Sequence, residues 1–255
     1  MKNSIVTLCC LISLFLSPSL CAQEDTESEK SLKFHYRIVA GLNIGGLTPV
    51  PLPDNIRKIK TFDPTLNPYI GVEGVYTLNN KWSVGISPRL QYKGMKVKNE
   101  VMYLHTIIQM GEGAEASSFE GAFSGTNYTE VKNLYLGVPF FVQFTPKNKW
   151  HCRLGGYVGF LLNSKFQGTV SDGYIRNGGS LGEKVQVTSA SFDFAKHVRT
   201  FDCGLHAGAI RDLGKRITID ASLEWGLRSA FPSSFSGISF PMYNIYAQLG
   251  LGYRL

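Results

Sequence analysis

Residues 133–162 have the sequence NLYLGVPFFVQFTPKNKWHCRLGGYVGFLL, and this stretch decides the fold class of the chain. Large apolar residues occupy every second position from Leu134 to Phe144, and glycine, proline and glutamine are among the residues between them. The alternation resumes at Trp150, after the short polar segment TPKNK. A period of two places successive side chains on opposite faces of a β-strand. The stretch therefore predicts two long antiparallel strands that are joined by a tight turn.

The same alternation recurs along the chain and gives eight predicted strands. They are 34–44, 69–78, 82–93, 133–144, 150–162, 201–210, 216–227 and 243–255. Each has about ten to thirteen residues, whereas strands of soluble proteins commonly have about five or six. A tilted strand needs about 9–11 residues to cross a membrane, so strand length favours a membrane protein. Pro88 and Pro139 fall inside two of the strands and predict local irregularities.

The connections between these strands are alternately long and short. The short ones are 79–81, 145–149 and 211–215, and the long ones are about 45–68, 94–132, 163–200 and 228–242. Outer-membrane barrels have this arrangement because tight turns lie on the periplasmic side and long loops on the outside. We therefore expect an all-β, eight-stranded antiparallel up-and-down transmembrane β-barrel with short periplasmic turns and long extracellular loops. A soluble eight-stranded barrel is the alternative.

The first residues have the layout of a secretory signal peptide. Lys2 provides a positive charge, residues 5–17 are apolar, and Ala22 precedes a polar residue. The alternatives are a membrane anchor, for which the apolar run is short, and a lipoprotein modified at Cys21. We expect cleavage after Ala22 and export to the bacterial outer membrane. The expected organisation is a signal peptide at 1–22, a short N-terminal periplasmic segment at 23–33 and the outer-membrane barrel at 34–255.

The composition argues against two other classes of protein. Mean hydropathy is close to zero and 18% of the 255 residues are charged, which excludes a protein with several membrane-spanning helices. The net charge of +7 is compatible with nucleic-acid binding. The basic residues are scattered, however, and form no basic helix or run. We therefore expect no nucleic-acid partner.

The polar faces of the predicted strands carry charges of both signs. An eight-stranded barrel is only wide enough for its own side chains to fill the interior. Charges buried there must pair, because an isolated buried charge is very costly. The sequence therefore predicts a packed polar network in the lumen, in place of an open pore. Its expected members are Arg37, Glu73, Arg89, Arg153, Asp202, Asp220 and Glu224.

Aromatic residues cluster at the predicted strand ends. Trp82, Trp150 and Tyr253 lie near the short turns, and Trp225 and Tyr243 lie near the long loops. This distribution is typical of the two aromatic girdles of a membrane barrel, and aromatic core packing is the alternative.

Two cysteines stand in the expected barrel, Cys152 and Cys203. Both fall on outward faces, but at different levels along their strands. Their separation exceeds the reach of a disulfide. We predict two free, lipid-facing thiols.

Three segments resemble the PorT-like outer-membrane β-barrel family, whose members are often labelled porin family proteins. They are NLYLGVPFFVQF, WHCRLGGYVGFLLN and FDCGLHAGAIRDLGKRITIDASLEWGL, the last with Asp202 and Gly204 in the usual places. The resemblance covers essentially the whole mature chain and the CAQ at the end of the expected signal peptide. It implies the barrel fold, and some relatives assist protein secretion through the outer membrane. It implies no catalytic motif.

Residues that could support chemistry are dispersed. The five histidines, His35, His105, His151, His197 and His206, have no metal-binding spacing, and phosphate-binding glycine patterns are absent. We therefore expect no catalytic, cofactor-binding or metal site and no cofactor. The one weak enzymatic pattern combines a nucleophile, a base and an orienting acid in one long loop. Its members are Ser189, Ser191, Asp193 and His197.

The expected function is that of a non-enzymatic outer-membrane barrel with a structural, binding or secretion-accessory role through its extracellular loops. The first alternative is a narrow porin or channel for small solutes. The second is an outer-membrane enzyme that modifies lipids. The expected partners are outer-membrane lipid and, as candidates, secretion or surface-assembly proteins.

Overall fold

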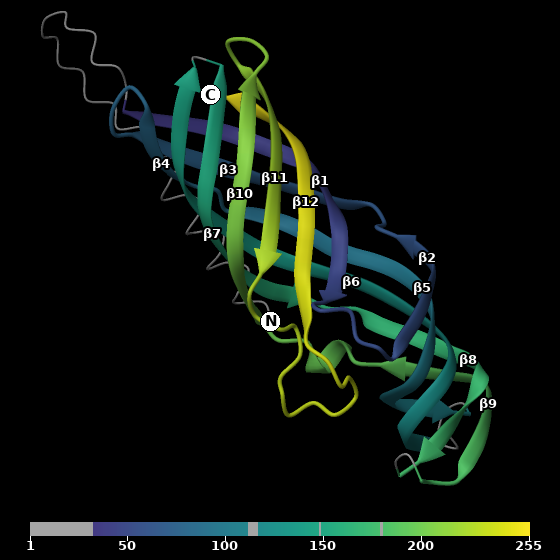
Figure 1. The fold of residues 1–255 in the computed structure, drawn as a ribbon. Coiled ribbons are helices and arrows are strands. Elements are labelled where there is room, and N and C mark those ends of the chain that lie inside the picture. The colour runs from purple at the N-terminus through teal and green to yellow at the C-terminus, as the bar shows by residue number, and fades with distance from the viewer. Residues whose placement is uncertain (1–32, 112–116, 148, 179–180) are drawn as a thin grey trace, which may run out of the picture. The chain divides into compact units, whose positions relative to one another are not determined.

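The computed structural model describes residues 33–111, 117–147, 149–178 and 181–255. These residues form a single antiparallel sheet of twelve strands and a short 3-10 helix at Ala195–His197 (Figure 1). The strands are β1 (Phe34–Pro49), β2 (Ile56–Asp63), β3 (Asn67–Thr77), β4 (Trp82–Ile86), β5 (Arg89–Met110), β6 (Ser117–Lys147), β7 (Trp150–Asn163), β8 (Phe166–Asn177), β9 (Lys184–Asp193), β10 (Phe201–Asp212), β11 (Ile217–Gly226) and β12 (Met242–Arg254).

The expected signal peptide, 1–22, and residues 23–32 of the expected periplasmic segment lie outside the described residues. Within the described ranges, no helix has both the length and the apolar character needed to cross a membrane.

The strand pairings close into a ring. The first strand, β1, pairs with the last strand, β12, on one side and with β3 on the other. β3 pairs with β4 and with the start of β5, and both of these pair with β6. From β6 the pairings continue through β7, β10 and β11 and return to β12. The ring positions are β1, β3, β4 with the start of β5, β6, β7, β10, β11 and β12.

The expected count of eight strands is wrong, because the sheet has twelve. One reason is the division of the predicted strand 82–93 into β4 and β5 at Ser87 and Pro88. Proline has no N–H to donate to a neighbouring strand, so the ladder is interrupted there. The carbonyl of Pro88 still accepts a hydrogen bond from Val72 at 3.1 Å, and Ser87 donates to Pro139 at 2.9 Å. The chain therefore keeps its place in the ring across the break.

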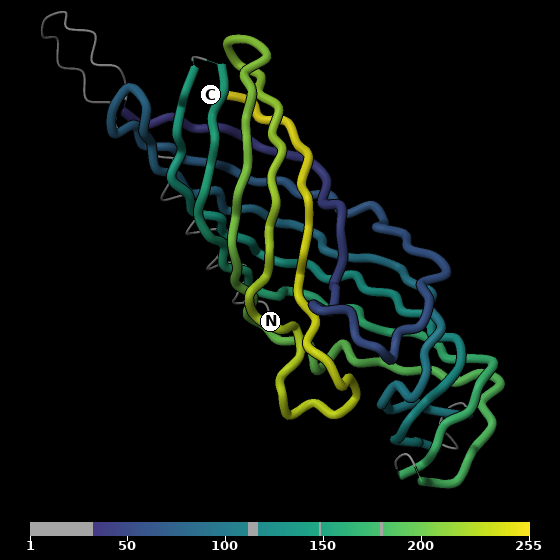
Figure 2. The backbone as a smooth tube through the Cα atoms, viewed as in Figure 1, coloured from purple at the N-terminus to yellow at the C-terminus, as the bar shows by residue number. Residues whose placement is uncertain are grey.

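The second reason is that three of the expected long loops contain strands. β5 and β6 continue beyond the ring and pair as far as Met110 and Ser117. β8 pairs with β6, β9 with β8, and β2 with β5. We call β2, β8, β9 and the parts of β5 and β6 at 94–110 and 117–132 the extension; Figure 2 shows its backbone continuing from that of the ring. It forms strands because its residues bury an apolar core of their own, which includes Leu104, Ile108, Phe123 and Ile175.

Side-chain polarity reverses between the ring and the extension. Outward-facing residues of the ring are apolar and exposed, such as Leu154 at 69% and Ile70 at 60%. Inward-facing residues of the ring are polar and buried, such as Gln91 and Glu224, which are both 0% exposed. The extension instead places its apolar residues inside. Only the extension has the polarity that is usual for a protein in water.

Closure of the ring between β1 and β12 predicts a disulfide. Leu42 and Leu249 are directly opposite each other, and opposed Cα atoms lie about 4.5–5.5 Å apart, within disulfide range. We expect Leu42→Cys with Leu249→Cys to form a disulfide on mild oxidation, in a background with the native cysteines replaced by alanine. The control is Leu42→Cys with Tyr253→Cys, four positions further along β12. Mass spectrometry checks both, and equal yields from the two pairs would contradict a closed ring.

Candidate functional site

The carboxylate of Glu73 lies between two arginines inside the ring. Glu73 on β3 is directly opposite Arg37 on β1, which donates from Nε and Nη2 to the two carboxylate oxygens at 2.9 and 3.0 Å. Arg153 on β7 donates to the same two oxygens from Nη1 and Nη2, both at 2.7 Å. The Glu73 side chain is 2% exposed. Two forked charge-assisted interactions therefore link three strands through one buried carboxylate.

Both arginines have further partners in this first cluster. Nη1 of Arg37 lies 3.3 Å from Oδ1 of Asp220 and also donates to the hydroxyl of Thr218. Arg153 donates to Oε1 of Gln143 from Nε at 3.0 Å and from Nη2 at 2.8 Å. The cluster thus satisfies both guanidinium groups with polar side chains that come from three strands besides their own, β3, β6 and β11.

A second cluster surrounds Glu224 on β11. Arg89 donates from Nη2 to Oε1 of Glu224 at 2.6 Å, and Nζ of Lys93 lies 3.0 Å from Oε2. Nζ of Lys93 also lies 3.5 Å from Oδ2 of Asp202. That oxygen accepts hydrogen bonds from the hydroxyl of Tyr157 at 3.0 Å and from Nδ2 of Asn244 at 2.9 Å. Glu224 and Lys93 are almost fully buried, so each needs the other as a counterion.

Aromatic rings enclose the ammonium group of Lys93. Its Nζ lies 4.4 Å from the ring centroid of Tyr157, 5.5 Å from that of Tyr135 and 5.7 Å from that of Tyr246. Ring faces attract a cation at these separations. The three tyrosine side chains therefore hold the ammonium group of Lys93 in the middle of the ring of strands. They also occupy space that water would otherwise fill.

The structure brings all seven residues expected in the lumen network into ion pairs inside the ring, in the two clusters just described. Lys93 was not among the predicted network residues, although it falls on the same face of β5 as Arg89 and Gln91. With it, four basic residues, Arg37, Arg89, Lys93 and Arg153, face four acidic ones, Glu73, Asp202, Asp220 and Glu224. Alternation along β5 was the signal that could have found it.

The two clusters separate two larger cavities. A polar cavity of about 370 Å³ opens near the short turns, and Arg37, Glu73 and Arg153 are among the residues that line it. An apolar cavity of about 310 Å³ lies on the side of the extension. Between them, the cavity beside Glu73 and Arg89 has a volume of only about 20 Å³, room for roughly one water molecule. The ion pairs of the two clusters therefore lie in the interior beside this small cavity.

The residues of the weak enzymatic pattern do not form a catalytic group. Ser189 and Ser191 lie on β9, and Oδ1 of Asp193 accepts a hydrogen bond from the backbone N–H of Ala195 at 2.9 Å. The ring of His197 stacks on that of Phe235, with centroids 4.4 Å apart. Across the described residues, no hydrogen bond joins His197 to either serine.

Neither the histidines nor the two cysteines that the structure describes gather into a metal site. No group of three or more histidine, cysteine, aspartate or glutamate side chains that could hold a metal ion occurs among residues 33–111, 117–147, 149–178 and 181–255. His151 lies 2.9 Å from the hydroxyl of Thr145 and 3.2 Å from Oδ2 of Asp212. Cys152 and Cys203 are both free, which confirms that they form no disulfide.

Because Glu73 pairs with both Arg37 and Arg153, we predict a large loss of stability when its charge is removed. Glu73→Gln keeps the shape of the side chain but leaves two buried guanidinium groups short of an anion. We expect the free energy of unfolding to fall by about 3–5 kcal/mol, measured by urea denaturation. The control is Glu100→Gln, which breaks an exposed pair with Lys60 at 2.8 Å and should change stability little, because water replaces the lost contact. Equal losses from both variants would contradict a structural role for the buried cluster.

Three solved outer-membrane proteins show weak similarity to this chain. The solved structure of Ail, the attachment invasion locus protein of Yersinia pestis, is 15% identical and matches 87% of this chain and 97% of that chain, with a TM-score of 0.32. The outer membrane protein OprG from Pseudomonas aeruginosa is 10% identical over 87% of this chain and 95% of that chain, with a TM-score of 0.31. The toluene transporter TbuX of Ralstonia pickettii is 9% identical over 86% and 89%, with a TM-score of 0.24. Scores this low carry no conclusion about function.

A comparison with curated proteins finds no match. A family model described as the outer membrane protein beta-barrel domain matches residues 21–232, which is most of the chain. The chain therefore belongs to the outer membrane protein β-barrel domain family.

Proposed function

We propose that this protein is a non-conducting outer-membrane barrel whose ring spans the membrane in eight passes and whose extension acts outside as a binding or accessory component. The observation that carries the proposal is the ring's inverted polarity, with paired charges inside and exposed apolar side chains outside. The proposal includes export by the signal peptide at 1–22, PorT-like membership and a non-enzymatic role.

The outward face of the ring supports membrane insertion. The side chains of Leu154, Ile70, Val72 and Leu251 are between 57% and 69% exposed, and they come from three different strands. A continuous apolar surface of this kind is rare on a protein in water, but it is what a lipid-facing band requires. A soluble barrel would place these side chains inside and its charges outside.

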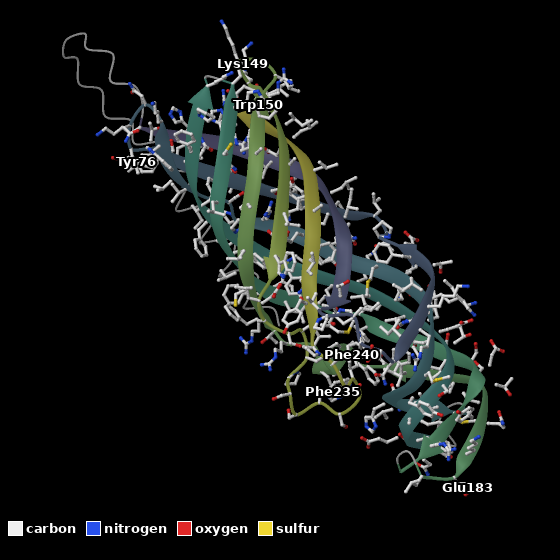
Figure 3. All side chains as sticks on the ribbon, in the orientation of Figure 1. Tyr76, Lys149, Trp150, Glu183, Phe235 and Phe240 are labelled. Atoms are coloured by element: carbon white, nitrogen blue, oxygen red, sulfur yellow. The ribbon has the colours of Figure 1, made fainter. Side chains whose placement is uncertain are left out.

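The aromatic residues at the strand ends support the same orientation. Trp82, Trp150 and Tyr253 point outward with 45%, 43% and 43% exposure. Figure 3 shows Trp150 beside Lys149 at the end of the short turns, far from Glu183 in the connection between β8 and β9. Trp225, toward the other end of the ring, is also 43% exposed. Amphipathic rings at two levels suit the two interfaces of a membrane.

The closed interior supports a role other than conduction. A solute would have to separate the ion pairs of both clusters, and charges that lose their partners in this buried setting are costly. The external end is the part of the protein left for function, since its strands carry a core and surface of their own. Outer-membrane lipid around the ring and surface or secretion proteins at the extension are the partners we propose.

Conductance in a planar bilayer tests the closed interior. We expect the folded, inserted wild type to show no current steps. A four-fold variant removes one acid and one base from each cluster. It combines Arg153→Ser and Glu73→Ser in the first cluster with Arg89→Ser and Glu224→Ser in the second. Because this four-fold variant widens both constrictions without changing the net charge, small discrete steps should appear.

The matched control makes the same exchanges in partly exposed ion pairs in and beside the extension. Lys60→Ser with Glu100→Ser and Lys165→Ser with Glu130→Ser also remove two bases and two acids, and this variant should stay silent. Circular dichroism confirms folding of each protein. Stable steps from the wild type would replace the proposal with the narrow channel.

Thiol labelling tests which face meets lipid. In a background without native cysteines, Leu136→Cys and Ile219→Cys should react with a membrane-soluble maleimide and resist an impermeant one, because both residues lie on the outward face of the ring. Glu183→Cys, in the exposed connection between β8 and β9, is the control and should react with the impermeant reagent in intact membranes. Ready labelling of both ring positions by the impermeant reagent would contradict the proposal that the outward face of the ring contacts lipid.

A further inference from the structure

The apolar cavity of about 310 Å³ lies where the ring meets the extension. Its walls come from β1, β2, β5, β6, β8 and β9 and from the segment between β11 and β12. That segment is held to the residues after the 3-10 helix by a hydrogen bond from the N–H of Arg199 to the carbonyl of Ala230 at 2.7 Å. Among the described residues that line the cavity, none is charged. The surrounding structure is therefore built to hold an uncharged, mostly apolar volume.

The cavity exists because the sheet divides beside Asn67. β3 begins at this residue, and its pairing with β1 therefore ends at Asn43. Beyond Asn43, β1 pairs with β12 but no longer with β3. Nδ2 of Asn67 donates to the carbonyl of Gly94 at 2.9 Å, and Nδ2 of Asn43 donates to that of Tyr92 at 2.7 Å. These side-chain bonds satisfy backbone groups where the strands separate. Beyond Asn43, the hydrogen-bonded pairing of β1 with β3 does not continue. Packed side chains form the wall of the cavity there.

Aromatic rings form one wall of the cavity. The centroids of Phe192 and Phe194 are 5.0 Å apart, and that of Phe166 lies 6.4 and 6.0 Å from them. Phe240, which is labelled in Figure 3 and belongs to the segment between β11 and β12, also lines the cavity. Aromatic rings pack favourably on one another at centroid separations of about 4.5–7 Å. This wall therefore suits an aromatic ligand.

Uncharged polar groups on β5 and β6 also line the cavity. Nδ2 of Asn127 donates to Oδ1 of Asn99 and to Oγ1 of Thr129, both at 3.1 Å. Asn99 is 6% exposed and Asn127 is 8% exposed. Within the described residues, Nδ2 of Asn99 and Oδ1 of Asn127 have no hydrogen-bond partner. The amide nitrogen of Asn99 can therefore donate to a neutral polar group of a ligand, and the carbonyl oxygen of Asn127 can accept from one.

We propose that this cavity binds one small, uncharged aromatic molecule that carries a hydroxyl or carbonyl group. A dry apolar cavity of about 150 Å³ accommodates benzene, so this one has room for a bicyclic ring system. The volume also falls at the lower end of the range of about 300–1,000 Å³ that is usual for ligand pockets. A charged ligand is disfavoured because no countercharge lines the cavity. The inference rests on the proposed binding role of the external end.

Three probes with the same skeleton test the chemistry: 2-naphthol, naphthalene and 2-naphthoate. Fluorescence titration of the purified full chain in detergent should show saturable binding of one 2-naphthol per chain. Naphthalene should bind about three- to tenfold more weakly, because it lacks the hydroxyl. The carboxylate of 2-naphthoate should weaken binding by at least tenfold relative to 2-naphthol, since it cannot be paired in the cavity.

Two variants locate the bound probe. Val97→Phe places a larger side chain in the cavity and should abolish saturable binding. Its control is Val142→Phe, the same exchange at an outward position of β6 that is 45% exposed, which should bind as the wild type does. Asn99→Leu should remove the advantage of 2-naphthol over naphthalene without removing naphthalene binding, and it tests the site independently if Val97→Phe does not fold.

The outcomes separate this inference from the proposed function. Absence of saturable binding to the wild type, or equal binding by Val97→Phe and Val142→Phe, would overturn the ligand site while a silent bilayer leaves the closed barrel intact. Current steps from a wild type that also binds 2-naphthol would overturn the closed barrel alone. Unchanged probe preference in Asn99→Leu would overturn the assigned polar contact.

Discussion

The paired contact of one buried carboxylate with two guanidinium groups is the interaction on which the ring depends. Glu73 holds Arg37 beside it and Arg153 across the interior, so three strands share one charge centre. A charge buried inside such a narrow ring needs a partner of opposite sign. The four basic and four acidic residues of the two clusters satisfy this requirement. With polar groups committed to the interior, the alternate residues of every ring strand are left to face outward, and they are apolar. Inverted polarity is thus the consequence of a paired interior, and it is also what suits the ring to lipid.

The level of Asn43 and Asn67 marks a boundary between two environments. On one side the strands bury charge and expose apolar residues, and on the other side the same β5 and β6 continue with apolar residues inside. One strand can serve both regions because the period of two does not change, only the residues assigned to each face. The two regions meet where the sheet divides, and the apolar cavity is the space that this meeting leaves. This arrangement is the reason for proposing that the protein binds a ligand at the extension and does not conduct.

Much of the fold and of the interior was predictable, and the failures have identifiable physical reasons. Alternation assigns all seven predicted network residues to one face, and the structure places them together inside the ring. Lys93 was missed although the same alternation includes it. The part of β6 in the extension was missed because glycine and serine between 117 and 128 resemble a loop, whereas in the structure a ladder and a shared apolar core hold these residues in a strand. The count of strands failed at Pro88 for a local reason, since a proline without an N–H divides what the pattern presents as continuous.

The sequence by itself determined which residues share a face, where the tight turns fall and that charges of both signs lie on the inner side. These properties are local, because the backbone geometry of a strand fixes the direction of each side chain relative to its neighbours. Only the tertiary structure decided which acid meets which base, where the ring closes and where the cavity lies. The hydrogen bond between Gln248 and Asn43 joins residues 205 positions apart, and the ion pair of Arg89 with Glu224 spans 135. No local pattern encodes such contacts, because they arise when the first and last strands meet and bring distant side chains into the same enclosed space.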